Sequence, residues 1–139
     1  LPAETTLAIA SLIFGGVLDK YPDMIMCFWQ GGGYAPYGVG RMRHGYATKP
    51  SAKTMQRPPG DYLGSLYYDC LTHNADSMEF LIQHVSPEHV LLGTDFPMPD
   101  GVPGGTVQWV KALDFLDTGD KEKILGGNAA RIFGVETTR

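Results

Sequence analysis

The chain has 139 residues, of which 43% are hydrophobic and 19% charged, with a formal net charge of -4. This composition is that of an ordinary globular protein, so we expect residues 1–139 to form a single domain or part of one. The net charge is negative and Lys and Arg are scattered, which argues against nucleic acid and anionic membrane surfaces as partners. No apolar stretch has a membrane-spanning length.

Cysteine usage bears on the cellular compartment. Cys27 and Cys70 each lie inside an apolar run with no second cysteine nearby. This spacing is unlike that of a disulfide framework or a zinc knuckle. We therefore expect two reduced, buried thiols and a cytoplasmic protein.

Three apolar runs predict β-strands. They span residues 24–29, 66–71 and 90–92. The first run is apolar on both faces, as is typical of parallel strands covered by helices. Each run ends in polar or glycine residues, which is where α/β folds carry their chemistry.

Helical periodicity predicts the connecting segments. The expected helices span residues 2–20, 34–44, 75–85, 107–116, 117–125 and 128–133. Asn74 and Asn128 are expected to cap two of them, and Gly134 to end the last. Residues 47–61 lack periodicity and predict a long loop.

The alternation of strands and helices indicates an α/β fold. About three strands are too few to close a barrel, so the edges of the sheet would present unpaired backbone groups. The first residue is Leu1 rather than Met, and the chain opens within a helical pattern. We therefore expect a fragment that by itself is unstable, dimeric or both.

Asp95 follows the third predicted strand, in Gly93-Thr94-Asp95. A carboxylate at a strand end can bind a metal ion or accept a substrate proton. Because Asp often opens loops, a cap for the following loop is about as well supported by the local residues.

Other polar residues near the strand ends give weaker signals. Gln30 is followed by three glycines, whose amides can line a pocket or simply form a tight turn. His73 can act as a ligand, a base or a hydrogen-bonded orienter. Arg41 can pair with a surface carboxylate or bind a substrate carboxylate. We expect His84 and His89 to face solvent.

Taken in order, several short motifs are far more specific than any one of them. Together they closely resemble the aminocarboxymuconate-semialdehyde decarboxylase family of the amidohydrolase superfamily. The resemblance spans essentially the whole chain and implies the C-terminal two-fifths of a TIM-like (β/α)₈ barrel. The motifs are Tyr21-Pro22, Gln30–Tyr37, Gly40-Arg41, His44–Tyr46, Tyr62–Gly64, Asp69–His73, Leu92–Pro97 and Gly127–Ala129.

The resemblance implies a single divalent metal ion, usually Zn²⁺, held by a His-x-His pair, a further His and an Asp. Asp95 resembles that Asp, and the other ligands would lie upstream of Leu1. The acid/base histidine of the family has its counterpart in Gln30. Since a carboxamide does not titrate near neutral pH, this change would remove general base catalysis, typically worth about 10²- to 10⁴-fold.

The resemblance also implies substrate contacts. Arg41 matches an arginine that reaches a substrate carboxylate across a dimer interface, which predicts a homodimer. Lys49 stands where close relatives have a second arginine, and Met98 occupies a position that is often aromatic and lines the substrate pocket. His73 matches a histidine of the family.

We therefore expect the parent protein to be a metal-dependent carboxy-lyase acting on a small unsaturated dicarboxylate. A related hydrolase or hydratase is the nearest alternative, because these enzymes share the barrel. A non-catalytic, truncated remnant that serves as an interaction module is the other, because Gln30 replaces the histidine and the upstream ligands are absent from this chain.

Overall fold

Three short parallel strands form the centre of the computed structural model, which describes residues 1–135. The sheet order is β1 (Cys27–Phe28), β2 (Tyr67–Asp69), β3 (Val90–Leu91). Tyr68 pairs with Phe28 on one side and with Val90 on the other. Because all strands run in one direction, their carboxyl ends meet at one edge of the sheet.

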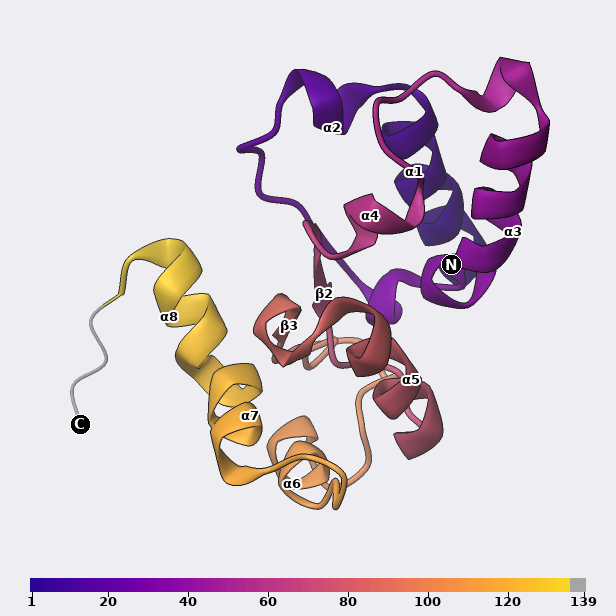
Figure 1. Ribbon diagram of the computed structural model, residues 1–139. Coiled ribbons are helices and arrows are strands. Elements are labelled where there is room, and N and C mark those ends of the chain that lie inside the picture. The colour runs from indigo at the N-terminus through magenta and orange to yellow at the C-terminus, as the bar shows by residue number, and fades with distance from the viewer. Residues whose placement is uncertain (136–139) are drawn as a thin grey trace.

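Helices surround this sheet (Figure 1). Four from the first half of the chain lie together on one side: α1 (Pro2–Phe14), α2 (Val17–Lys20), α3 (Ala35–Thr48) and α4 (Gly60–Leu63). The second half contributes α5 (Ala75–Val85), α6 (Thr106–Lys111), α7 (Thr118–Glu122) and α8 (Asn128–Phe133). Single turns at η1 (Gln30–Gly32), η2 (Pro50–Ala52), η3 (Pro87–His89) and η4 (Lys123–Gly127) complete the connections.

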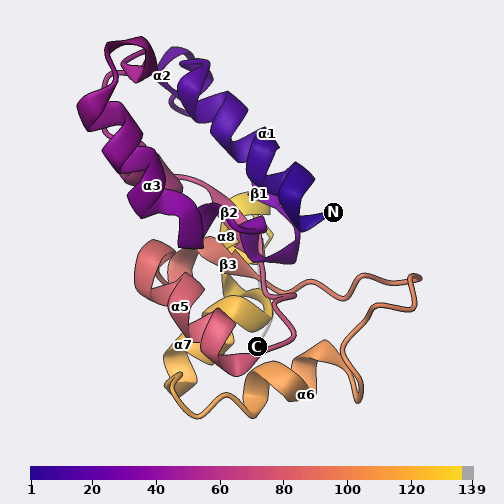
Figure 2. The ribbon, with the colours of Figure 1, turned by 90° about the vertical axis from the view of Figure 1, so that its right-hand side faces the viewer.

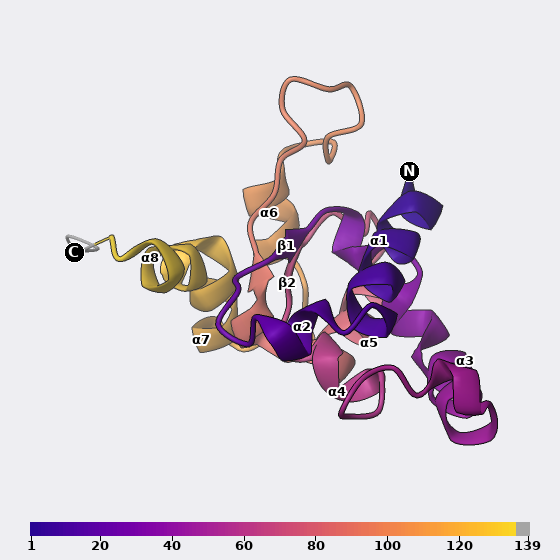
Figure 3. The same cartoon turned by 90° about the horizontal axis from the view of Figure 1, so that it is seen from above.

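The segment between β3 and α6 projects away from the rest of the molecule, as two perpendicular views show (Figures 2 and 3). It follows the carboxyl end of β3 and is mostly exposed. It therefore lies beside the edge at which the strands end.

The core is built on alternate residues of the middle strand. Leu66, Tyr68 and Cys70 are fully buried, and the Tyr68 hydroxyl donates a hydrogen bond to the carbonyl oxygen of Leu63 at 2.9 Å. Ile9 of α1 and Met78 of α5 are also fully buried in this cluster. Burying apolar side chains of this size stabilises a fold by about 1.5–3 kcal/mol each.

The predicted α/β architecture with about three parallel strands is confirmed. The predicted helix over residues 2–20 is interrupted, because Gly16 has φ 67° and separates α1 from α2. Residues 113 and 116 bury their side chains although α6 already ends at Lys111. Within residues 1–135, no helix has the length and apolar character needed to cross a membrane.

The expectation that the first strand is buried on both faces is wrong for this chain. β1 lies at the sheet edge and pairs only with β2. Phe28 is buried, but Ile25 and Trp29, which flank the strand, are 57% and 62% exposed. Cys27 is exposed too, whereas Cys70 is buried as predicted. A cytoplasmic location stays a prediction.

The predicted long loop over residues 47–61 contains one turn, η2, and the start of α4. It is held against α2 by the carboxylate of Asp19. The Tyr62 hydroxyl donates to Asp19 Oδ1 at 2.6 Å, and the Gln56 amide donates to Oδ2 at 2.9 Å. The hydrogen bond from Tyr62 is the main reason why the pKa of Asp19 lies below its usual range.

The two predicted asparagine caps have different outcomes. Asn74 caps α5 as expected, since its side chain accepts a hydrogen bond from the Ser77 amide at 2.9 Å. Asn128 is not a cap. Its side-chain amide donates to the carbonyl oxygens of Pro87 at 2.8 Å and Val90 at 2.7 Å, so it fastens α8 to the entry of β3. Gly134, with φ 62°, ends α8 as predicted.

The three glycines after Gln30 form a tight turn between β1 and α3 in which no side chain fits. A Cβ at Gly31 would lie 2.8 Å from Thr72 Cγ2, and one at Gly32 would lie 2.6 Å from Tyr68 Cε1. At Gly33 it would lie 2.1 Å from the carbonyl oxygen of Pro2. The turn is therefore wedged between α1 and the middle strand.

We predict that Asn128→Ala lowers the free energy of unfolding by about 1–3 kcal/mol, because two carbonyl groups lose a buried donor. Urea denaturation measures this. Gln108→Ala, which removes an exposed amide from α6, is the control and should change stability little. Equal stability of the two variants would contradict the fastening role of Asn128.

A second prediction concerns the glycine turn. Gly33 has φ 63°, so Gly33→Ala should cost about 1–3 kcal/mol in backbone strain, in addition to the clash with Pro2. Gly38→Ala is the matched control, because a Cβ there meets nothing within 4 Å and Ala favours helix. Thermal or urea unfolding should separate the two. A Gly33→Ala variant as stable as the control would refute the steric constraint.

Candidate active site

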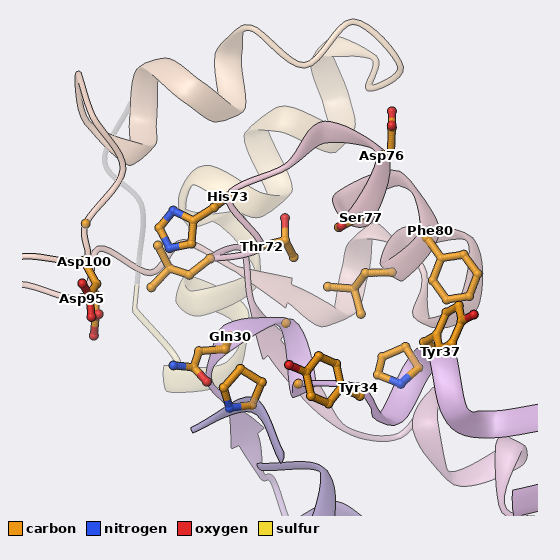
Figure 4. Close-up of a pocket in the computed structure, with 17 residues that line it drawn as sticks. Gln30, Tyr34, Tyr37, Thr72, His73, Asp76, Ser77, Phe80, Asp95 and Asp100 are labelled. Atoms are coloured by element: carbon orange, nitrogen blue, oxygen red, sulfur yellow. The ribbon is translucent and has the colours of Figure 1, made fainter. Parts of the chain in front are cut away.

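A cavity of about 790 Å³ lies where the three strands end (Figure 4). Residues that follow each strand line it. Gln30 follows β1 after Trp29, His73 lies in the turn after β2, and Asp95 lies in the loop after β3. The parallel sheet therefore brings together three polar side chains that are far apart in the sequence.

These three residues share an unusual backbone conformation. Gln30 has φ 55°, His73 φ 56° and Asp95 φ 56°. Ser86 is the one further non-glycine residue with positive φ among residues 1–135. Left-handed backbone at such positions costs about 1–3 kcal/mol and is concentrated at functional sites. The strain and the cavity thus coincide.

The Gln30 side chain has an unsatisfied acceptor. Its Oε1 is buried and has no hydrogen-bond partner among residues 1–135. A buried polar atom without a partner costs about 1–3 kcal/mol, so this side chain adds a local energetic cost beside the strained backbone. Gln30 itself is only partly buried and lines the cavity.

Asp95 is exposed and lines the cavity on the side where Asp100 also lies in Figure 4. The Asp95 carbonyl oxygen accepts a hydrogen bond from the Met98 amide at 2.7 Å. Its carboxylate accepts none within the described part of the chain, so the alternative of a side-chain cap for the following loop finds no support. Both carboxylate oxygens are available to a ligand.

The opposite wall of the cavity is aromatic (Figure 4). Tyr34 and Tyr37 come from the start of α3, and Phe80 comes from α5. The ring centroids of Tyr37 and Phe80 lie 6.0 Å apart. The two rings are tilted by 47°, so the cavity offers an aromatic wall facing a polar edge, which suits an unsaturated molecule with polar substituents.

Asp69, the last residue of β2, is a site residue that sequence reasoning did not single out. Its Oδ1 accepts hydrogen bonds from the amides of Gly31 at 2.9 Å and Leu71 at 3.1 Å. Burial raises the pKa of its carboxyl group above the usual range, and the nearby Asp95 carboxylate raises it further, against these hydrogen bonds. The available signal was a charged residue inside the apolar run 66–71.

Three of the predicted substrate contacts lie outside this cavity. Arg41 on α3 and Lys49 at its end are exposed, and Met98 is 59% exposed in the projecting loop. None of them lines the cavity. The structure thus unites Gln30, His73 and Asp95 but not the remaining predicted residues, whose roles stay predictions.

Two histidines expected to face solvent differ from each other. His84 is exposed, as predicted. His89 is half-buried, because its ring stacks on Tyr67 with 4.9 Å between centroids and its Nδ1 lies 2.9 Å from the Leu66 carbonyl oxygen. Both lie away from the cavity lining.

The donor set for a metal ion is incomplete in this part of the protein. Among residues 1–135, no three His, Cys, Asp or Glu side chains converge on a common point. A zinc site needs about three or four ligands. Asp95 fits the role of one carboxylate ligand, so the others would have to come from outside the described residues.

Comparison with known proteins supplies a context for this geometry. A family model described as amidohydrolase matches residues 1–135. The 2-amino-3-carboxymuconate-6-semialdehyde decarboxylase of Dictyostelium discoideum is 39% identical over 143 residues, covering 100% of this chain and 39% of that protein. Its counterpart in Caenorhabditis elegans is 34% identical, covering 98% of this chain and 34% of that protein. The chain therefore spans well under half the length of these relatives.

Solved structures agree on the fold. The 5-carboxyvanillate decarboxylase of Sphingomonas paucimobilis matches with a TM-score of 0.85 at 21% identity, over 97% of this chain and 41% of that one. A dihydroxybenzoic acid decarboxylase of Polaromonas, solved with bound manganese and an inhibitor, matches with a TM-score of 0.85 at 23% identity, over 99% of this chain and 42% of that one. These neighbours are TIM-barrel amidohydrolases, so the three strands correspond to part of such a barrel. The chain belongs to the amidohydrolase family.

Proposed function

We propose that the complete protein carrying this chain is a metal-dependent carboxy-lyase that removes CO₂ from a small unsaturated dicarboxylate. The observation that carries this proposal is the convergence of Gln30, His73 and Asp95, all with left-handed backbone, on one cavity at the strand ends. The names of the relatives support decarboxylation as the reaction. The aromatic wall of Tyr34, Tyr37 and Phe80 supports a planar, conjugated substrate.

Asp95 is the proposed metal ligand. Its unpaired carboxylate faces the cavity, and its fixed position after β3 suits coordination of a divalent cation together with ligands from outside this chain. Such an ion, when bound, acts as a Lewis acid on substrate oxygens. Zn²⁺ is the ion that the family resemblance implies, whereas the Polaromonas neighbour was solved with manganese.

Gln30 takes the place of an acid/base group in this proposal. Its carboxamide neither gains nor loses a proton near neutral pH, so in this proposal it orients water or substrate by hydrogen bonding and does not transfer a proton. His73 lies on the neighbouring turn, and histidine is the residue type most often used as a general acid or base. We assign it a supporting role in proton transfer or orientation.

The substrate carboxylates need cationic partners, and the side chains of the cavity include Asp76, Asp95 and Asp100 but no Lys or Arg among the described lining residues. We propose that Arg41 supplies this charge from a second copy of the chain, since it is exposed on α3. Lys49 adds a second charge without bidentate geometry. Met98 would contact the substrate only if the projecting loop folds over the cavity.

A second candidate function is a non-catalytic interaction module. Gln30 favours it, because the side chain at the acid/base position does not titrate. A related hydrolase or hydratase remains the nearest enzymatic alternative. Decarboxylase assays on the complete protein, with metal content measured in parallel, separate the three. CO₂ release supports the proposal, hydrolysis or hydration supports the enzymatic alternative, and a metal-free inactive protein supports the module.

We predict that Asp95→Asn in the complete protein lowers metal affinity by at least about tenfold, the effect typical of disturbing even a ligand's hydrogen-bond partner. Competition with a chromogenic chelator measures this. Asp114→Asn, an exposed carboxylate outside the cavity, is the matched control and should bind metal as the wild type does. Unchanged affinity in Asp95→Asn would remove Asp95 from the metal site.

We also predict that Gln30→His raises the rate of decarboxylation of aminocarboxymuconate semialdehyde by at least about tenfold, a modest share of what general base catalysis supplies. The gain should grow as the pH rises through about 6.5, where an imidazole loses its proton and becomes a base. The test is to measure initial rates with the metal site fully loaded, from about pH 5 to about pH 8, a range that spans the pKa of an ordinary imidazole. A flat profile and an unchanged rate would exclude position 30 from proton transfer.

A further inference from the structure

Asp69 contacts the turns that follow β1 and β2 and the backbone that follows β3. It ends β2, the middle strand, and one carboxylate oxygen accepts two backbone amides, from Gly31 at 2.9 Å and from Leu71 at 3.1 Å. The first of these hydrogen bonds joins residues 38 positions apart. A single side chain thus ties the turn after β1 to the turn after β2.

On the β1 side, this hydrogen bond holds a conformation that has little intrinsic stability. Gln30 and Gly31 have φ 55° and 59°, and the turn is closed by hydrogen bonds from the amide of Gly32 to Trp29 at 3.0 Å and from Gly33 to Gln30 at 2.9 Å. Asp69 supplies the acceptor for the Gly31 amide, next to Gln30. The direction of the Gln30 side chain therefore depends on Asp69.

On the β3 side, Asp69 packs against backbone. A Cβ at Gly93 would lie 2.9 Å from the Asp69 Cβ and 3.3 Å from its Oδ2. Gly93 precedes Asp95 by two residues, so its close approach to Asp69 fixes how far the Asp95 segment lies from the middle strand. Glycine at position 93 is what permits this approach.

We propose that Asp69 is a positioning residue that sets the separation and direction of Gln30 and Asp95 across the cavity. This inference rests on the proposed function, because it assigns Asp69 a role in the same site. Asp69 acts through the backbone of its two neighbours. Its contribution is to geometry, and it therefore acts on turnover more than on substrate binding.

The variants Asp69→Ala and Asp69→Asn separate positioning from general stabilisation. Asn keeps an acceptor oxygen at the same place and should hold the turn, whereas Ala cannot. In the complete, metal-loaded protein we expect Asp69→Ala to lower kcat by at least about tenfold with KM changed less than about threefold, as a misplaced reacting group does. Asp69→Asn should keep kcat within about threefold of the wild type.

Hydrogen exchange gives a readout that does not need activity. The peptide covering residues 29–33 should exchange at least about tenfold faster in Asp69→Ala than in the wild type, and at the wild-type rate in Asp69→Asn. Asp117→Ala is the matched control, since Asp117 also accepts a backbone amide, from Asp120 at 2.8 Å, but caps α7 away from the cavity. It should change neither kcat nor exchange at residues 29–33.

Gly93→Ala covers the case in which Asp69→Ala does not fold. It keeps Asp69 and Asp95 in the sequence but displaces the Asp69 side chain through the 2.9 Å contact with the new Cβ, so it should lower kcat and speed exchange at residues 29–33 in the same way. Unchanged exchange in both variants overturns the proposal, as does lower stability with an unchanged kcat. A wild-type protein without decarboxylase activity overturns the proposed function instead, and the exchange rates still decide the role of Asp69.

Discussion

The close packing of the glycine turn between α1 and β2 is the constraint on which the rest of the site depends. Pro2, Thr72 and Tyr68 each occupy the space that a side chain at residues 31–33 would need. Because these contacts leave no space for the turn to move, its conformation is fixed. The end of the turn therefore determines where α3 begins. This places Tyr34 and Tyr37 on one wall of the cavity and Gln30 at its base.

The same constraint fixes the backbone of Gln30, so the environment of its side chain can be interpreted. In a loose loop, a glutamine would be one more polar surface residue. Here its backbone is left-handed and its Oε1 is buried without a partner among residues 1–135, so the molecule keeps a strained, unsatisfied group in place. Buried polar groups without a hydrogen-bond partner are rare in folded proteins, so this one distinguishes the site from the rest of the described chain.

Much of the fold was predictable from the sequence because apolar runs and helical periodicity are local signals. They located all three strands and the Asn74 cap of α5. These signals gave wrong predictions where contacts between distant segments determine the structure. Asn128 has the residue type of a cap but bonds to Pro87 and Val90. The exposure of Trp29 depends on which strand lies beside β1, and periodicity carries no information on strand order.

For the site, sequence motifs found the polar residues after the strands, but they gave no role to Asp69, the residue that links them. Asp69 was hidden inside an apolar run, and its hydrogen bond to Gly31 spans 38 positions. The left-handed conformations of Gln30, His73 and Asp95 could not be predicted from the sequence either. They have a consequence for thermal stability. Selection for heat resistance alone would replace these residues by glycine or asparagine, which tolerate that backbone. Keeping Gln30, His73 and Asp95 at these positions therefore lowers the thermal stability that the fold would otherwise reach.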